Sequence, residues 1–174
     1  GMPENLRYLE LVRPALVRLA AEFRDLTMRL VSSGTPPWAD VPVELVPWSE
    51  EGEVEALCSA DIGIMPLFDD DWSNGKCAFK IIQYMAAGLP CVASRTAMNC
   101  EVVSHGHNGF LASTTSEWEN RLRTLLIADD RGRSLGQAGR RLVEQRFDRR
   151  LVAPQTAELI ASVAHPHSLN SNSS

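Results

Sequence analysis

The sequence predicts an α/β protein, built as a three-layer α/β/α domain with a mainly parallel sheet. Short runs rich in β-forming residues alternate with helical patterns along most of the 174 residues, as is typical of parallel strands joined by helices. The run Asp61–Leu67 is almost entirely apolar, which is expected of a strand buried on both faces. A chain of this length suits one domain with a single sizeable core.

The first part of the chain is predicted to be helical. Apolar residues recur at spacings of three and four over residues 5–22. Pro14 should kink or split this helix, because proline lacks a backbone N–H and its ring clashes with the preceding turn. The next expected elements are strands at Leu26–Ser32 and Val43–Val46, a short helix at Glu50–Cys58 and the buried strand at Asp61–Leu67.

A polar loop at Asp69–Gly75 then leads into a helix at about Lys76–Ala87. Gly88 and Pro90 follow this helix, which is a regular C-terminal signal. The remaining expected elements are a strand at Cys91–Ser94, a short helix near Cys100–Ser104, a turn at Gly106–Gly109, a strand at Phe110–Ala112 and helices at Ser116–Ala128, Arg131–Arg146 and Leu151–Val163. We therefore expect one domain over residues 3–163 and a flexible polar tail over residues 164–174.

The start of the chain departs from the usual order of a parallel sheet. Such a sheet usually opens with a strand, and in a doubly wound sheet this first strand is central. Here a helix begins almost at once, so we expect the first strand to be missing from the chain. The gap would be closed by rearranged strands or by a partner molecule, and a homodimer is one such arrangement.

Charge and cysteine content exclude several classes of protein. The net charge of -5 argues against a nucleic-acid-binding surface, which would be basic. The four cysteines form no CxxC pair, so we expect buried or neutral thiols in a reducing compartment. No apolar run approaches the roughly 20 residues that span a bilayer. No signal peptide opens the chain, so we expect a cytoplasmic protein, with peripheral membrane contact left open for a further domain.

The helix predicted after the polar loop carries a polar stripe. On a helical wheel, Lys76, Lys80 and Gln83 fall within one narrow sector. The distance from the first to the last of them along the helix is about 10 Å, at a rise of about 1.5 Å per residue. This length suits a diphosphate at the helix tip and a ribose along its side. A surface helix with ordinary lysines is the alternative.

The residues just before this helix favour the phosphate interpretation. Free backbone N–H groups at a helix start, together with the helix dipole, attract phosphate. Asn74 and Gly75 precede the expected start, and a glycine permits close approach to the backbone.

Several groups of residues in this order resemble a known family. They are Lys80-x-x-Gln83-Tyr84-Met85-Ala86-x-Gly88-x-Pro90 with Val92-Ala93-Ser94, then Glu101-Val102-Val103 and Gly106-x-Asn108-Gly109-Phe110-Leu111, then Arg131, Leu135-Gly136, Gly139-Arg140 and Val143-Glu144 before Phe147. Over about residues 3–160 the chain resembles the retaining glycosyltransferases of the two-domain B-type fold, the glycosyl transferases group 1 family. The matching part of that family is the carboxy-terminal, Rossmann-like, nucleotide-sugar-binding domain.

The resemblance implies a metal-independent donor-binding domain with no cofactor, whose substrate is a nucleotide diphosphate sugar. The parent enzyme would transfer the sugar to an acceptor hydroxyl with retention of configuration. The amino-terminal acceptor domain is missing from this chain, so the chain alone should be inactive. A catalytically inactive nucleotide-binding or regulatory module with the same fold is the alternative.

The resemblance also implies roles for individual residues. The expected contacts are Asn74, Gly75, Lys76, Cys77 and Lys80 for the diphosphate, Gln83 for the ribose, Val46, Pro47 and Trp48 for the base, and Asp71 and Glu101 as candidate donor-sugar contacts, with no metal ligand and no general base. The family pattern has two glutamates separated by seven residues, and their positions here are Gly75 and Gln83. An amide can still bond to ribose hydroxyls. The GKC-x-FK-x-x-QYMA pattern resembles one branch of the family, so we interpret the departure as a subfamily trait.

Other interpretations of these residues are weaker or remain open. Asp69-Asp70-Asp71 is expected to be a solvated loop, not a metal site, and His105 and His107 are expected to be loop residues. No G-x-G-x-x-G follows a strand, which argues against a nicotinamide-binding domain. Trp48 could pack in the core, and Glu101 could cap a helix that it begins.

Overall fold

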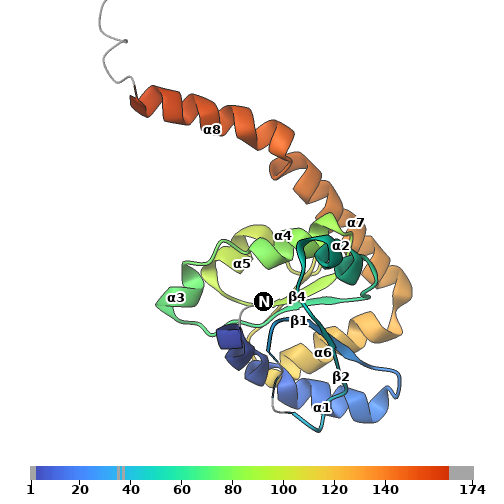
Figure 1. The fold of residues 1–174 in the computed structure, drawn as a ribbon. Coiled ribbons are helices and arrows are strands. Elements are labelled where there is room, and N and C mark those ends of the chain that lie inside the picture. The colour runs from blue at the N-terminus through green and yellow to red at the C-terminus, as the bar shows by residue number, and fades with distance from the viewer. Residues whose placement is uncertain (1–2, 35, 37, 165–174) are drawn as a thin grey trace, which may run out of the picture.

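The computed structural model describes residues 3–34, 36 and 38–164, and it confirms the layered α/β fold. In chain order the elements are η1 (Pro3–Leu11), α1 (Arg13–Glu22), β1 (Met28–Val31), β2 (Val43–Val46), α2 (Glu50–Cys58), β3 (Gly63–Met65), α3 (Asp71–Asn74), α4 (Phe79–Ala86), β4 (Cys91–Ser94), α5 (Ala97–Val102), β5 (Phe110–Ala112), α6 (Thr115–Ile127), α7 (Asp129–Arg146) and α8 (Arg149–Ala164). Helices α1 and α6 lie on one side of the strands, and α2, α4 and α5 lie on the other (Figure 1). The tail expected from residue 164 lies outside the described residues, apart from Ala164 itself.

The first helical stretch is split near Pro14, as the sequence predicts. Residues up to Leu11 form a 3-10 helix, and a regular α-helix begins at Arg13 with Pro14 in its first turn. Proline is tolerated there, because the first backbone N–H groups of a helix have no partner within the helix. Val12 and Leu16 are both buried in the core.

All of the strand pairings are parallel, and the strands form two sheets. β1 pairs with β2, and β3, β4 and β5 form the second sheet in that order. β2, β4 and β5 have the bounds expected from the sequence, whereas β1 and β3 are shorter than expected. In the part of the chain that the structure describes, no strand joins β1 to β3, so the expected sheet is divided in two.

The core lies on both faces of β4, whose four residues are all buried. Val92 faces a cluster formed mainly by α1 and α6, including Leu19, Trp118 and Leu122. Cys91 and Ala93 face a second cluster, which contains Ile81 and Met85 of α4. Alternate side chains of a strand point to opposite faces, so β4 ties the two clusters together.

The four cysteines differ in burial. Cys91 is buried, and burial raises the pKa of its thiol to about 12. Cys58, Cys77 and Cys100 are exposed. Of the expected buried or neutral thiols, Cys91 is therefore the buried one.

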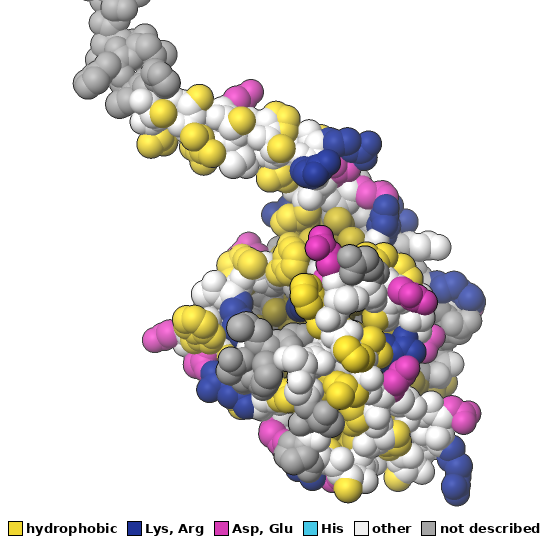
Figure 2. Space-filling view, viewed as in Figure 1, with side chains coloured by type: hydrophobic (Ala, Val, Ile, Leu, Met, Phe, Trp, Pro, Cys, Tyr) yellow, Lys and Arg dark blue, Asp and Glu magenta, His cyan; other side chains and the backbone are white. Residues whose placement is uncertain are grey.

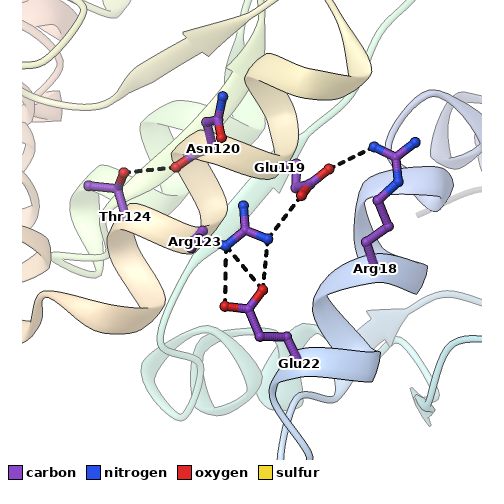
Figure 3. Close-up of polar contacts among 6 residues, drawn as sticks. All are labelled: Arg18, Glu22, Glu119, Asn120, Arg123 and Thr124. Carbon is purple, nitrogen blue, oxygen red and sulfur yellow. Dashed lines mark hydrogen bonds and ion pairs between the residues drawn. The ribbon is translucent and has the colours of Figure 1, made fainter.

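An ion-pair network joins α1 to α6 on the face opposite α4. Arg123 donates hydrogen bonds to both oxygens of Glu22 and to Glu119, and Arg18 binds the other oxygen of Glu119 at 2.7 Å (Figure 3). α6 itself begins with a capping box between Thr114 and Glu117. The network fixes the relative position of two helices that share one core cluster.

Helix α7 packs unusually close to α4 because two glycines face the contact. A Cβ at Gly136 would lie 2.0 Å from the Gly88 carbonyl oxygen, and one at Gly139 would lie 2.8 Å from Met85. Gly88 itself has φ +74° just after α4, the left-handed conformation expected for a helix-ending glycine. Helix α4, which carries Lys80 and Gln83 of the predicted site, is thereby held between β3 and β4 on one side and α7 on the other.

Candidate functional site

The helix that carries the predicted site begins later than the sequence suggests. Instead of starting at Lys76, α4 starts at Phe79, and the loop before it contains the short helix α3. The cause is Ala78, which has φ 53° and is fully buried. Lys76 and Cys77 therefore precede the helix, and the predicted single stripe of Lys76, Lys80 and Gln83 is wrong for its first member.

Ala78 is in the left-handed region, with φ 53° and ψ 24°, immediately before the first residue of α4. A residue in the left-handed region followed by a helical residue turns successive backbone N–H groups toward one concave side, and such a nest attracts anions. The dipole of α4 adds partial positive charge at the same place. A non-glycine residue held at positive φ costs free energy, and such residues are concentrated at binding and catalytic sites.

Lys80 and Gln83 meet a carboxylate that the sequence did not single out. Lys80 Nζ lies 2.7 Å from Oε1 of Glu53, which comes from α2. The hydrogen bond from Lys80 holds the pKa of Glu53 below its ordinary value, and the side chains of Gln83 and Trp48 act in the same direction. We call these four residues, Trp48, Glu53, Lys80 and Gln83, the Glu53 cluster.

The Glu53 cluster offers both hydrogen-bond donors and hydrogen-bond acceptors to a ligand that carries several hydroxyl groups. The Glu53 side chain is 21% exposed and that of Lys80 is 42% exposed, so a ligand can reach the pair. Gln83 Oε1 is buried and has no hydrogen-bond partner among the described residues. Trp48 is 56% exposed, so the alternative that it packs in the core is wrong. Val46 ends β2 and Pro47 is exposed beside Trp48.

Lys76 belongs to a different group of residues, centred on Tyr8. Its ammonium lies 4.2 Å from the centroid of the Tyr8 ring and donates to Asn5. Arg7 also donates to the Tyr8 hydroxyl, at 3.2 Å, and Ser73 lies 3.4 Å from the same oxygen. These contacts, with the Ser73 hydrogen bond the largest, lower the pKa of Tyr8. Arg7 thus adds a second cation beside Lys76, and nothing in the local sequence pattern indicated it.

Asn74, Gly75 and Cys77 have more ordinary surroundings. The Asn74 side chain donates to Asp69 at 3.0 Å and accepts from the backbone N–H of Ala97 at 3.0 Å, so it links α3 to the start of α5. Gly75 ends α3 at φ -80°, and a Cβ there would make only ordinary contacts. Cys77 is exposed in the segment that leads to α4.

The acidic residues of the site have defined local roles. Asp70 caps α3 by accepting from the backbone N–H of Ser73 at 2.7 Å, and Asp71 is exposed in the first turn of α3. Helix α5 spans Ala97–Val102, not Cys100–Ser104, so Glu101 is exposed in its last turn. The expectation that Glu101 begins a helix is wrong, and capping of the N-terminus does not explain this residue.

Parallel strands covered on both faces by helices define a Rossmann-like domain. The model of the family described as "Glycosyl transferases group 1" matches residues 3–128. The chain belongs to this family. None of the curated proteins compared with the chain matches it in sequence.

Solved structures with a similar fold agree with this membership. HepE (Alr3699) of Anabaena, in complex with UDP-glucose, superposes with a TM-score of 0.67 at 18% identity, over 87% of this chain and 45% of that one. Sucrose-phosphate synthase of Thermosynechococcus elongatus gives 0.65 at 19% identity, over 90% and 43%. The C-terminal domain of a glycosyl transferase group 1 family protein (LpcC) from Francisella tularensis gives 0.62 at 14% identity, over 76% and 75%. The chain therefore spans less than half of the first two proteins.

In the described residues, no helix is both long enough and apolar enough to cross a membrane.

Proposed function

We propose that this chain is the donor-binding domain of a retaining glycosyltransferase, which transfers a sugar from a nucleotide diphosphate sugar to an acceptor hydroxyl. Family membership and the similarity in fold to HepE, whose structure contains UDP-glucose, support a nucleotide-sugar-binding domain. The acceptor would be bound by a second domain of the parent enzyme. The isolated chain is then expected to bind the donor without turning it over.

The observation that carries this proposal is the Glu53 cluster. Trp48 follows β2 and Lys80 and Gln83 lie on α4, so residues far apart in the sequence meet at one carboxylate. In our assignment the base stacks on the exposed face of Trp48. The ribose hydroxyls bond to Gln83 and Glu53. Gln83 offers an amide at a position where the family pattern has a glutamate, and Glu53 offers a carboxylate from a different helix.

The diphosphate is assigned to the lysines and to the start of α4. Lys76 and Lys80 are the only lysines among the 17 lysine and arginine residues of the chain. Each is two residues from Ala78 in the sequence, next to Asn74, Gly75 and Cys77. Fixed cations and backbone N–H groups aimed at the departing diphosphate stabilise the negative charge that develops as the sugar leaves. In this assignment the protein's own cations provide that charge, without a metal ion, and Asp71 and Glu101 are candidate contacts of the sugar.

A catalytically inactive nucleotide-binding module is the second candidate. Gly75 and Gln83 stand where the family pattern has glutamates, and a Cβ at Gly75 would meet only ordinary contacts. The position is therefore not reserved for glycine by packing, and the loss of a carboxylate there would remove a sugar contact. This candidate predicts nucleotide binding with no preference for the sugar-bearing form.

Calorimetric titration of the chain with UDP, GDP and ADP, without metal, tests donor binding. We expect one nucleotide to bind, and Lys80→Ala and Gln83→Ala each to weaken it. Lys80→Ala should cost about tenfold to a hundredfold, since a hydrogen bond to a charged group contributes about 1.5–3 kcal/mol. Arg18→Ala is the matched control, because Arg18 also forms a 2.7 Å ion pair with a glutamate, far from the site. Absence of binding by the folded chain would contradict the proposal.

The two lysines also permit a direct test of the diphosphate assignment. Reductive methylation with a carbon-13 label should give NMR signals from Lys76, Lys80 and the chain's amino terminus alone. We expect both lysine signals to shift on titration with the bound nucleoside diphosphate, and not with the corresponding nucleoside. A shift of neither lysine signal by a nucleotide that calorimetry shows to bind would refute the assignment. Comparing the diphosphate with its sugar-bearing form separates the two candidate functions.

A further inference from the structure

Three arginines gather near Phe110 of β5, an end strand of the second sheet. The guanidinium carbon of Arg121, from α6, lies 5.5 Å from the centroid of the Phe110 ring, and that of Arg131, from α7, lies 5.8 Å from it. The third, Arg95, follows β4, and its charge acts on His105, whose ring lies 5.6 Å from that of Phe110. We call Arg95, Arg121 and Arg131 the arginine group.

Within the described residues, Arg121 does not pair with the carboxylate that its own helix offers. Glu117 lies one turn earlier in α6, at the spacing at which glutamate and arginine usually pair. Its Oε2 instead accepts the backbone N–H groups of Ser113 at 2.7 Å and Thr114 at 3.2 Å, beside the cap of α6. Nε of Arg121 is buried and has no hydrogen-bond partner in the part of the chain that the structure describes. The guanidinium therefore lies against the Phe110 ring with its charge still available to an anion.

Arg131 is exposed and lies beside the turn between α5 and β5. A Cβ at Gly106, in that turn, would come 4.0 Å from Nη2 of Arg131. The neighbouring acid, Asp130, pairs with Arg133 at 2.9 Å. The N–H groups of the Arg131 guanidinium are thus open to a ligand that approaches from solvent.

His105 indicates that the electrostatic potential is positive at this place. Its Nδ1 accepts the backbone N–H of Leu111 at 3.0 Å, so the neutral ring carries its proton on Nε2 as a further donor. Desolvation lowers its pKa most, followed by the charges of Arg121 and Arg95, and the opposite effect of Glu117 is the smallest of the four. The whole chain has a net charge of -5, so this positive region is a local feature.

A phosphate monoester suits the arginine group better than a carboxylate does. The planar guanidinium matches phosphate geometry and binds two oxygens at once. A phosphate monoester carries about 1.5 to 2 negative charges near pH 7 and three acceptor oxygens, so it can accept from more than one guanidinium. Stacking on an aromatic ring restricts a guanidinium before the ligand arrives, which reduces the entropy lost on binding.

We propose that the arginine group is a second anion-binding site, which takes a phosphate monoester group. It shares no element with the Glu53 cluster, because it comes from the segment after β4 and from α6 and α7, whereas the cluster comes from the segment after β2 and from α2 and α4. A phosphorylated molecule bound here leaves the donor site unoccupied. The proposal therefore does not depend on the proposed function.

An NMR titration with glycerol 3-phosphate tests the site on the whole chain. The signals to follow are the Nε–H of Arg121 and the ring of His105. We expect both to shift and to saturate at millimolar concentration, with no such response to acetate at the same ionic strength. A shift that does not saturate, or that acetate reproduces, would mean an adventitious ion only and would overturn the proposal.

Arginine variants give the test a matched control. Arg121→Gln and Arg131→Gln should each weaken binding about tenfold, as expected when a hydrogen bond to a charged group is lost. Arg133→Gln removes the same charge from α7, where Arg133 pairs with Asp130, and should bind as wild type does. Unchanged binding in both Arg121→Gln and Arg131→Gln would contradict the assignment.

A donor-site variant separates this site from the donor site. The response of His105 to glycerol 3-phosphate should persist in Lys80→Ala, because Lys80 belongs to the Glu53 cluster. Loss of the response in that variant would show that the ester acts through the donor site, and would overturn the proposal.

Vesicles distinguish two sources of the phosphate group. Phosphatidic acid in phosphatidylcholine vesicles presents the same phosphate monoester on a lipid. We expect the chain to bind the soluble ester and to remain in the supernatant when these vesicles are sedimented. Sedimentation that needs phosphatidic acid and that Arg131→Gln reduces would support the phosphate site and assign its source to a lipid headgroup.

Discussion

At the scale of single residues, Ala78 combines complete burial with a backbone conformation that alanine rarely adopts. The left-handed region costs an L-residue about 1–2 kcal/mol. That cost is retained in a segment whose N–H groups and neighbouring lysines we assign to phosphate binding. The strain and the nest are two consequences of the same conformation, and strained residues of this kind are concentrated at binding and catalytic sites.

Ala78→Gly should be close to neutral for stability. Glycine relieves the strained φ, which offsets the loss of a buried methyl group, about 0.8 kcal/mol, and the greater freedom of the unfolded chain, about 0.4–1 kcal/mol. Ala15→Gly is the matched control, because Ala15 is equally buried but lies in α1, where glycine should cost about 1.5–2 kcal/mol. Urea unfolding measures both changes. Equal losses in the two variants would mean that Ala78 is not strained.

His105 should make the fold sensitive to mild acid. Its Nδ1 accepts the backbone N–H of Leu111 at 3.0 Å, and desolvation, followed by the charges of Arg121 and Arg95, lowers its pKa. The folded state therefore binds a proton less tightly than the unfolded chain. This contribution to stability is present above a pH of about 6.5, the ordinary histidine pKa, and is lost as pH falls through the lower folded value.

The measurement is the free energy of unfolding from pH 7.5 to 5 for wild type, His105→Asn and His107→Asn. The loss of stability on acidification should be smaller in His105→Asn, which cannot titrate in this range. His107→Asn makes the same change two residues along the same turn and controls for the loss of a histidine there. If all three proteins lose stability in parallel, His105 does not contribute.

At the scale of elements, the contact between α4 and α7 should be intolerant of a single added methyl group. A Cβ at Gly136 would lie 2.0 Å from the carbonyl oxygen of Gly88, a backbone atom that cannot move aside without shifting the end of α4. Gly136→Ala should therefore destabilise the domain by roughly 2 kcal/mol or more, within the range known for overpacked interiors.

Gly132→Ala is the control on the same helix. The nearest atom to its Cβ would be Cγ of Pro90 at 3.6 Å, an ordinary contact. Alanine in place of a helical glycine should then stabilise α7 by about 0.5–1 kcal/mol. Thermal unfolding measures the Tm of Gly136→Ala and of Gly132→Ala. A similar Tm for the two variants would show that α7 can shift away from α4.

The elements that could be predicted from the sequence are those with local signals. The bounds of β2, β4, β5 and α2 follow from apolar runs and from Ser49, whose side chain caps α2. The start of α4 could not be predicted, because alanine carries no signal for the left-handed conformation of Ala78. Helix α3 was missed because four residues capped by Asp70 are too short to show a period.

The candidate site was predictable in part for a similar reason. Lys80 and Gln83 were predicted from the spacing within one helix, which is local information. Glu53 is 27 residues from Lys80, and Tyr8 is 65 residues from Ser73, so their contacts depend on how α2 and η1 pack. A solvated glutamate in α2 and a tyrosine in a helical stripe have many ordinary explanations, and the sequence offers nothing that distinguishes these two.

At the scale of the whole molecule, α8 stands apart from the layered body (Figure 1). None of its side chains is buried, and apolar side chains lie along much of its surface (Figure 2). The exposed apolar residues are Leu151, Val152, Leu159, Ile160 and Val163. Among the described elements, α8 makes its main contact with α7 alone.

Removal of the chain after Asp148 should therefore leave the stability of the body almost unchanged. Burial of apolar surface is the main source of stability, and α8 buries none of its side chains, so the free energy of unfolding should change by less than about 1 kcal/mol. The shortened chain should also aggregate less, because five exposed apolar side chains are removed with the helix. Urea unfolding and light scattering of the two proteins measure these effects. A loss of more than about 2 kcal/mol, well above what a solvent-exposed segment contributes, would mean that α8 folds back on the body in solution.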